Sequence, residues 1–207
     1  MNLDFLTYTL ILFVIGVSLK MFFNSDAYNL TCVISNEDGN TYCVRERAKL
    51  RLVADLLART TMDLKKLVKH MGEKYPERDN VNRLVSKFTP KKIVEILQTS
   101  KYTAYSENKG EKIAFCVTKE KRNNDTLIDD NTLMFVALHE LAHVATKSIG
   151  HTDEFWSNFK FLLQNAKEIN IYKPVDYKKD PERYCGMDIT DNPYFDYHTK
   201  KPTKKSS

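Results

Sequence analysis

Cysteine is scarce in this chain, and its spacing excludes one common kind of metal site. The four cysteines among 207 residues, Cys32, Cys43, Cys116 and Cys185, are widely separated and form no CxxC pair. A zinc knuckle built from cysteines is therefore not expected. Cys32 and Cys43 flank the turn-like sequence NEDGN, and they are expected to pair if the domain faces an oxidising compartment. Free thiols in a reducing compartment are the alternative.

The chain also lacks internal repeats and any dense stripe of basic residues. Its net charge is only +5, and Lys200, Lys201, Lys204 and Lys205 supply much of it. A nucleic-acid surface would concentrate basic residues and interleave them with aromatic ones, so nucleic acid is not expected as a partner. Residues 196–207 are expected to form a basic, disordered tail. The 42% hydrophobic and 29% charged content is that of a globular domain with a real core.

Charge is absent from one long stretch near the N-terminus. Residues 5–19 contain no charged side chain, and Lys20 is followed by three more apolar residues. Spanning a bilayer takes roughly 20 apolar residues, so residues 3–23 are expected to form a single-pass membrane anchor, with Lys20 reaching toward the headgroups. A cleaved signal peptide, with Ser25 and Ala27 as a weak small-x-small site, and a buried helix are the alternatives.

Membrane topology stays open at this level. Lys20, Arg45 and Arg47 follow the span and nothing basic precedes it, which favours a cytoplasmic domain. Asn29-Leu-Thr and Asn124-Asp-Thr are glycosylation acceptors if the domain is lumenal instead. The sequence does not indicate an oligomeric state.

Residues 24–84 are expected to hold a loop or short hairpin followed by an amphipathic helical region. Gly72 is expected to end the first helix, residues 79–88 to form a second, and the first helix to pack on the domain, with a coiled-coil dimer as the alternative. The apolar positions of the first helix keep a three-four spacing: Leu50, Val53, Leu57, Leu64, Leu67 and Met71.

Residues 85–195 are expected to form an α+β domain with a small antiparallel sheet. Thr89-Pro90 predicts the start of a helix that runs to about Gln98. The segment 101–119 predicts a β-hairpin that turns at Asn108-Lys-Gly110, with the strand KIAFCV at the sheet edge beside the site. Two further helices are expected: one capped by Asp130, Asn131 or Thr132, and one at about 152–168. The remainder is expected to be irregular.

The first of these last two helices carries a histidine pair of particular chemistry. His139 and His143 are four residues apart, so both stand on one helix face and can reach one metal ion. Glu140 is placed to reach a water molecule on that metal. This is the HExxH arrangement, in which the glutamate is the general base of a zinc metallopeptidase. A catalytic zinc ion takes three protein ligands, and His151, after Gly150, is the expected third, with Glu154 and Glu168 as alternatives.

The wider sequence resembles a known family. The runs NKGEKIAFCV, NTLMFVALHELAH, GHTDEFWSNFKFLL and YCGMDI are similar to WLM-type zinc metallopeptidases, a group similar to SprT and to bacterial YgjP-like proteins, in versions found in large DNA viruses. The resemblance covers residues 85–195. It implies a zincin-like fold, one Zn²⁺ ion held by His139, His143 and His151, and Glu140 as catalytic base.

The expected function is a membrane-anchored zinc metallopeptidase that hydrolyses a peptide or protein substrate. Tyr172, Tyr177 and Tyr184 are candidates for the side chain that stabilises the developing oxyanion, although each is also a candidate packing residue. Phe155 and Trp156 are expected to hold His151 in place. One alternative is an inactive zinc-binding structural or assembly protein of a membrane or virion. The other is a membrane-tethered interaction module that uses the helix at 45–71.

Overall fold

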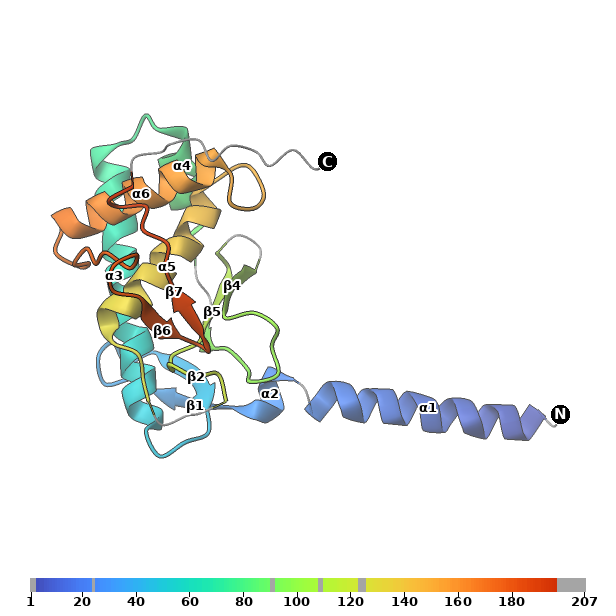
Figure 1. Ribbon diagram of the computed structural model, residues 1–207. Coiled ribbons are helices and arrows are strands. Elements are labelled where there is room, and N and C mark those ends of the chain that lie inside the picture. Colours follow the sequence, from blue (N-terminus) through green and yellow to red (C-terminus); the bar gives the residue numbers. More distant parts are fainter. Residues whose placement is uncertain (1–2, 24, 90–91, 108–109, 123–125, 197–207) are drawn as a thin grey trace, which may run out of the picture.

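An extended N-terminal helix projects from a mixed helix-and-sheet domain (Figure 1). The computed structural model describes residues 3–23, 25–89, 92–107, 110–122 and 126–196. The basic tail after Asp196, Asn108 of the predicted turn and Asn124 of the second glycosylation tripeptide lie outside these residues. The α+β class expected from the sequence is confirmed.

The main sheet has five strands in the order β1-β2-β3-β5-β4. The pairs β1–β2 and β4–β5 are antiparallel, whereas β2–β3 and β3–β5 are parallel. The expectation of an antiparallel sheet was therefore wrong, because the central pairings are parallel. The five strands are β1 (Leu30–Ile34), β2 (Thr41–Arg45), β3 (Lys92–Glu95), β4 (Ala104–Glu107) and β5 (Lys112–Phe115).

Strand β3 replaces the helix that Thr89-Pro90 predicted up to Gln98. Its Ile93 and Val94 and the following Ile96 are all buried, since the strand runs between β2 and β5. β-branched side chains fit a sheet that is covered on both faces, so this tertiary setting overrides the local helix-start signal.

The hairpin predicted at 101–119 is present as β4 and β5, but its place in the sheet differs from the prediction. The strand KIAFCV contains β5, which lies between β3 and β4, so the sheet edge is β4. Strand β4 packs beside helix α5 (Asp130–Ala145).

Helix α3 (Leu50–Lys74) buries its apolar face inside the domain. This confirms the prediction that the helix packs on the domain. Gly72 does not end this helix, which continues to Lys74. A Cβ at Gly72 would lie 3.0 Å from the Val85 side chain of α4 (Asp79–Lys87). The glycine therefore permits close helix packing rather than termination.

Helix α5 is buried on nearly all sides and forms the centre of the core. Its cap is Asp129, whose side chain accepts a hydrogen bond from the Thr132 backbone N–H, so the predicted caps Asp130, Asn131 and Thr132 were each wrong. Helix α6 (Asp153–Glu168) begins after Thr152, as predicted, and packs against α5.

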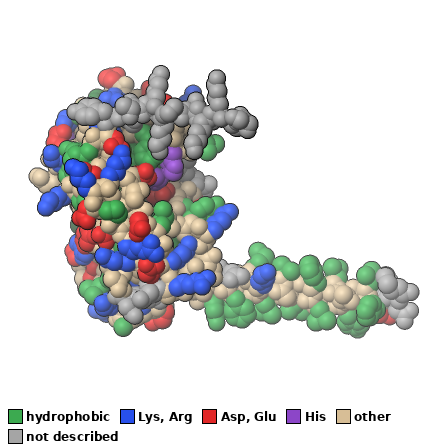
Figure 2. All heavy atoms as spheres, viewed as in Figure 1, with side chains coloured by type: hydrophobic (Ala, Val, Ile, Leu, Met, Phe, Trp, Pro, Cys, Tyr) green, Lys and Arg blue, Asp and Glu red, His purple; other side chains and the backbone are tan. Residues whose placement is uncertain are grey.

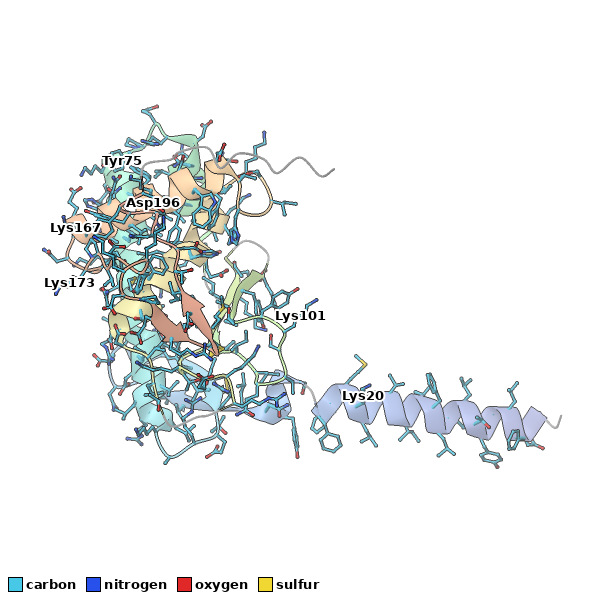
Figure 3. All side chains as sticks on the ribbon, in the orientation of Figure 1. Lys20, Tyr75, Lys101, Lys167, Lys173 and Asp196 are labelled. Carbon is cyan, nitrogen blue, oxygen red and sulfur yellow. A yellow bond between two sulfur atoms is a disulfide. The ribbon has the colours of Figure 1, made fainter. Side chains whose placement is uncertain are left out.

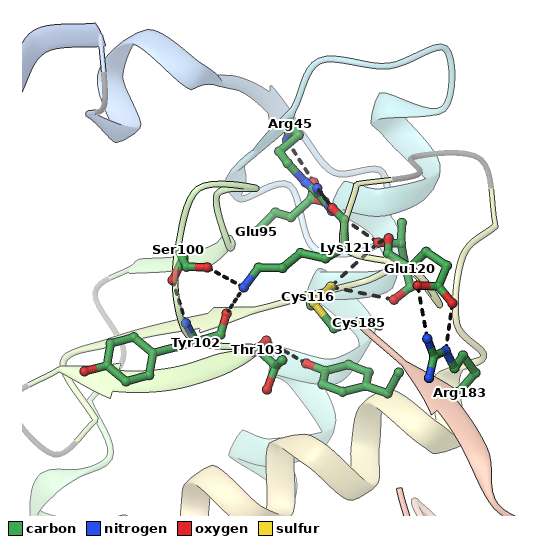
Figure 4. Close-up of a disulfide and its surroundings, with 12 residues drawn as sticks. Arg45, Glu95, Ser100, Tyr102, Thr103, Cys116, Glu120, Lys121, Arg183 and Cys185 are labelled. Atoms are coloured by element: carbon green, nitrogen blue, oxygen red, sulfur yellow. Dashed lines mark hydrogen bonds and ion pairs between the residues drawn. A yellow bond between two sulfur atoms is a disulfide. The ribbon is translucent and has the colours of Figure 1, made fainter. Parts of the chain in front are cut away.

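The C-terminal region contains a hairpin that the sequence did not predict. Strands β6 (Glu182–Tyr184) and β7 (Met187–Ile189) pair around Cys185 and Gly186, which have φ values of 52° and 83°. Cys185 is disulfide-bonded to Cys116, at the end of β5, and Cys32 is bonded to Cys43 across β1 and β2. The proposed Cys32–Cys43 pair is thus present, and the second bridge fastens the hairpin to the sheet (Figure 4).

Helix α1 (Leu3–Phe23) is exposed along its length and is not a core helix. Its segment Asp4–Phe23 is long and apolar enough to cross a membrane, a property that signal sequences share. Short helix α2 (Asp26–Asn29) connects it to β1.

A buried ion network joins β2 to β3. Glu95 has no exposed side-chain surface, and its carboxylate accepts hydrogen bonds from the Arg45 backbone N–H at 2.8 Å and from the side chains of Arg45 and Arg47. Both arginine side chains are therefore held at the β2–β3 junction inside the domain, whereas Lys20 lies in the last turn of the exposed helix α1.

Candidate metal centre

Three histidines from two successive helices converge on one point. His139 and His143 stand one turn apart on α5, and His151 lies just before α6. The Nε2 atoms of His139 and His151 are 3.0 Å apart, and one ring nitrogen of each histidine lies within 4.8 Å of the others. The geometry brings together the three residues that the sequence singled out as ligands.

Burial keeps the imidazoles of His139 and His143 neutral. Burial, with the nearby His143 and His151, lowers the pKa of His139 to about 3. Burial, with His151, lowers the pKa of His143 to about 4. A metal ion binds the neutral form of imidazole, so no proton has to leave either ring at neutral pH.

The donor set fits zinc. Nitrogens bound to one tetrahedral zinc at about 2.1 Å are about 3.4 Å apart. The His139–His151 separation of 3.0 Å is close to that value, and all three nitrogens lie within 4.8 Å of one another. His151 is exposed while His139 and His143 are partly buried, so the cluster has an open side. Three imidazoles with an open position are typical of catalytic rather than structural zinc sites.

Glu140 lies beside the first histidine in a nearly dry environment. Glu140 is only 7% exposed, and burial raises the pKa of its carboxyl group to about 7. A base works best when its pKa is near the working pH, and a carboxyl of this kind can both accept and return a proton.

The loop between α5 and α6 turns His151 back toward the cluster. Gly150 has φ of 83°, a conformation that favours glycine. Glu154, in the first turn of α6, accepts hydrogen bonds from the backbone N–H groups of Lys147 and Ser148 at 3.0 and 3.1 Å. These bonds hold the pKa of Glu154 at about 2, so the carboxylate stays ionised and fixes the loop.

The two alternative third ligands therefore have other partners. Glu154 is occupied by the loop and by Arg83, whose guanidinium also donates to the Ala145 carbonyl oxygen at 2.9 Å. Glu168, at the far end of α6, is paired with Lys74. Arg83 precedes the region of family resemblance, and no local sequence pattern marks its role.

Aromatic rings support the histidines, in agreement with the packing role expected for Phe155 and Trp156. The ring centroid of Phe155 lies 4.8, 4.3 and 4.6 Å from those of His139, His143 and His151. Trp156 packs against His151 at 5.6 Å. Phe155 is fully buried, so its ring is a rigid surface against which all three imidazoles pack.

The three candidate tyrosines are all buried, and Tyr184 is the one whose hydroxyl is influenced by Glu140. Burial, and then the charge of Glu140, raises the pKa of Tyr184. The Tyr184 hydroxyl donates to the Thr103 carbonyl oxygen at 2.9 Å (Figure 4). Tyr172 and Tyr177 instead pack against Phe135, on the core side of α5. Of the three tyrosines, Tyr184 is therefore the candidate that lies close enough to Glu140 to interact with its charge.

Replacing Glu154 by alanine is expected to weaken zinc binding about 10-fold, because the loop that presents His151 loses its hydrogen-bond acceptor. Competition with a chelating dye measures the affinity. Asp153→Ala, one residue away in the same exposed turn of α6, is the matched control and should bind zinc like the unaltered chain. Equal affinities for all three proteins would contradict this role for Glu154.

Comparison with known proteins finds viral relatives. No family model matches the chain. It is 36% identical over 129 residues to a protein of Acanthamoeba polyphaga mimivirus, covering 62% of this chain and 63% of that one. It is 42% identical over 84 residues to a protein of Invertebrate iridescent virus 3, covering 41% and 50%. The chain thus spans less than two thirds of these relatives' lengths, and their viral origin agrees with the resemblance noted from the sequence.

Solved structures give a partial backbone likeness. The crystal structure of Wss1 from Saccharomyces cerevisiae matches with a TM-score of 0.48 and 17% identity, covering 61% of this chain and 87% of that one. A mutant of the same protein matches with the same TM-score and 16% identity. These values carry no information on what this chain acts on.

Proposed function

We propose that this protein is a membrane-anchored, zinc-dependent metallopeptidase of the WLM type. One observation carries the proposal: three imidazoles from α5 and the start of α6 converge within 4.8 Å, with the buried carboxyl of Glu140 beside them. An open three-histidine site next to a base of this kind is suited to hydrolysis.

The protein's own residues would divide the work as follows. His139, His143 and His151 would hold one Zn²⁺ ion, which supplies a Lewis acid that polarises a carbonyl group and acidifies water. Glu140 takes the proton of the attacking water and returns it to the leaving amine. The free edge of β4, beside α5, offers backbone groups with which an extended substrate can pair as an added strand.

Helix α1 and the two disulfides indicate where in the cell the protein would be located. The apolar helix α1 is proposed to span a membrane once. All four cysteines are paired, and disulfides persist in oxidising compartments. We therefore favour an arrangement in which the catalytic domain lies on the oxidising side of that membrane.

Metal analysis and a chelator test decide the zinc-dependent activity. The full-length chain, purified in detergent and then inserted into vesicles, is expected to contain about one zinc ion per chain and to cleave an unfolded protein substrate. A chelator should abolish cleavage, and added zinc should restore it. Cleavage that survives complete zinc removal would contradict the proposal.

The second candidate is a zinc-binding structural or assembly protein that lacks activity. The intact Glu140 beside the ligands speaks against it, because a structural site has no use for a buried base. Stoichiometric zinc with no cleavage of either soluble or membrane-tethered unfolded substrates would favour this second candidate.

A further inference from the structure

The domain is joined to its N-terminal helix without a long linker. The Asn29 side-chain amide donates to the carbonyl oxygens of Phe23 and Ser25 at 2.7 and 2.9 Å. The Tyr28 ring packs against Phe22 and Phe23, with centroids 5.4 and 4.9 Å apart. These contacts tie the end of α1 to α2, and α2 leads directly into β1. The domain is therefore held next to the end of the anchor.

The metal centre faces the side of the domain from which this anchor leaves. In Figure 1, α1 extends to the right, and both the 146–152 loop and β4 also reach toward the right of the domain. Figure 2 shows histidine side chains (purple) toward this same side. Because His151 is the exposed member of the cluster, the open side of the site lies here as well.

The residues on this side have the chemistry of a membrane-contacting surface. Ile149, in the 146–152 loop, is 94% exposed, and Tyr102 is 51% exposed. Lys101 lies on the side toward α1, whereas Lys167 and Lys173 lie on the opposite side (Figure 3). Exposed apolar residues, tyrosines and lysines together are typical of protein surfaces at the level of lipid headgroups.

We propose that Lys101, Tyr102 and Ile149 rest on the bilayer that α1 crosses, so that the metal centre opens toward the membrane surface. The substrates are then unfolded segments of membrane proteins close to the bilayer, not freely diffusing proteins. The substrate class rests on the metallopeptidase function proposed above, whereas the orientation rests only on the proposed membrane span of α1.

Fluorescence quenching tests the orientation without any activity. The full-length chain carries an environment-sensitive fluorophore on a single added cysteine, Ile149→Cys or, as matched control, Lys173→Cys. Both proteins are inserted into vesicles of phosphatidylcholine and phosphatidylserine that contain spin-labelled lipid. Strong quenching at position 149 and little at position 173 is expected. Equal quenching at the two positions, or more at 173, overturns the orientation.

A substrate series tests the consequence for specificity. Each substrate is a single-span protein with one cleavable, unfolded site either about 10 or about 50 residues from the membrane. The near site is expected to be cleaved at least ~10-fold faster, because the fixed junction confines the active site to a thin layer. A flexible spacer of about 30 residues inserted directly after Phe23 adds a reach of about 30 Å and should remove most of the preference.

Two results would overturn the substrate class. One is equal cleavage of near and far sites by the unaltered chain, and the other is an unchanged preference after the spacer is inserted. Absence of cleavage from every substrate overturns the metallopeptidase function and the substrate class with it. The quenching measurement still decides the orientation in that case, so the two failures are distinguishable.

Discussion

Glu140→Gln is expected to keep its zinc and to lose peptide hydrolysis by about 100- to 10,000-fold, the range that a positioned acid–base group contributes. Glutamine is close to glutamate in size, so the buried position stays filled, but an amide cannot take a proton from water. The ligand set of His139, His143 and His151 is untouched. Zinc content per chain and kcat/KM on an unfolded substrate are measured on the same sample.

Two further variants bracket this result. His139→Ala should lose both zinc and turnover, because it removes a ligand rather than the base. Glu73→Gln, an exposed carboxylate on α3 far from the site in sequence, should match the unaltered chain in both measurements. Unchanged turnover in Glu140→Gln would remove the catalytic role of this residue, whatever its zinc content.

Glu95→Ala is expected to destabilise the fold by about 3–5 kcal/mol, the usual cost of removing one partner from a buried ion pair. The substitution leaves Arg45 and Arg47, whose side chains are 5% and 4% exposed, without their shared carboxylate. Two buried guanidinium groups close together would then repel each other. Chemical unfolding of the full-length chain in detergent measures the change.

A more exposed ion pair at the edge strand of the same sheet is the matched control for this experiment. Glu107 of β4 pairs with Lys112 of β5 at 3.2 Å, but its side chain is 50% exposed. Glu107→Ala should therefore change stability by less than about 1 kcal/mol. Similar losses in the two variants would show that burial of Glu95 is not what makes its network matter.

The sequence predicted those parts of the fold that depend on local patterns. The apolar spacing in α3, the Thr152 start of α6 and the β4–β5 hairpin each follow from residues close together in the chain. The histidine cluster was also predictable, because His139 and His143 share a helix turn and Gly150 permits the chain to reverse before His151.

The features that the sequence did not reveal depend on contacts between distant segments. Residues 92–95 form a strand because β2 and β5 flank them, although their local signal favours a helix. Arg83 reaches the loop at the metal centre from α4, and Cys116 meets Cys185 across a separation of 69 residues. No short-range pattern encodes any of these meetings.

The Cys116–Cys185 bridge has a practical consequence for anyone who prepares this protein. It fastens the hairpin that carries Tyr184 next to Glu140. The hairpin's noncovalent attachments include backbone bonds from Cys185 and Gly186, the hydrogen bond from Tyr184 to Thr103, the burial of Tyr184 and exposed ion pairs such as Arg183–Glu120. In material expressed in a reducing bacterial cytosol, or stored with a thiol reagent, the hairpin would lack its covalent bond to the sheet. A test of the proposed peptidase activity should therefore use a sample in which both disulfides are formed, with the reduced sample assayed beside it.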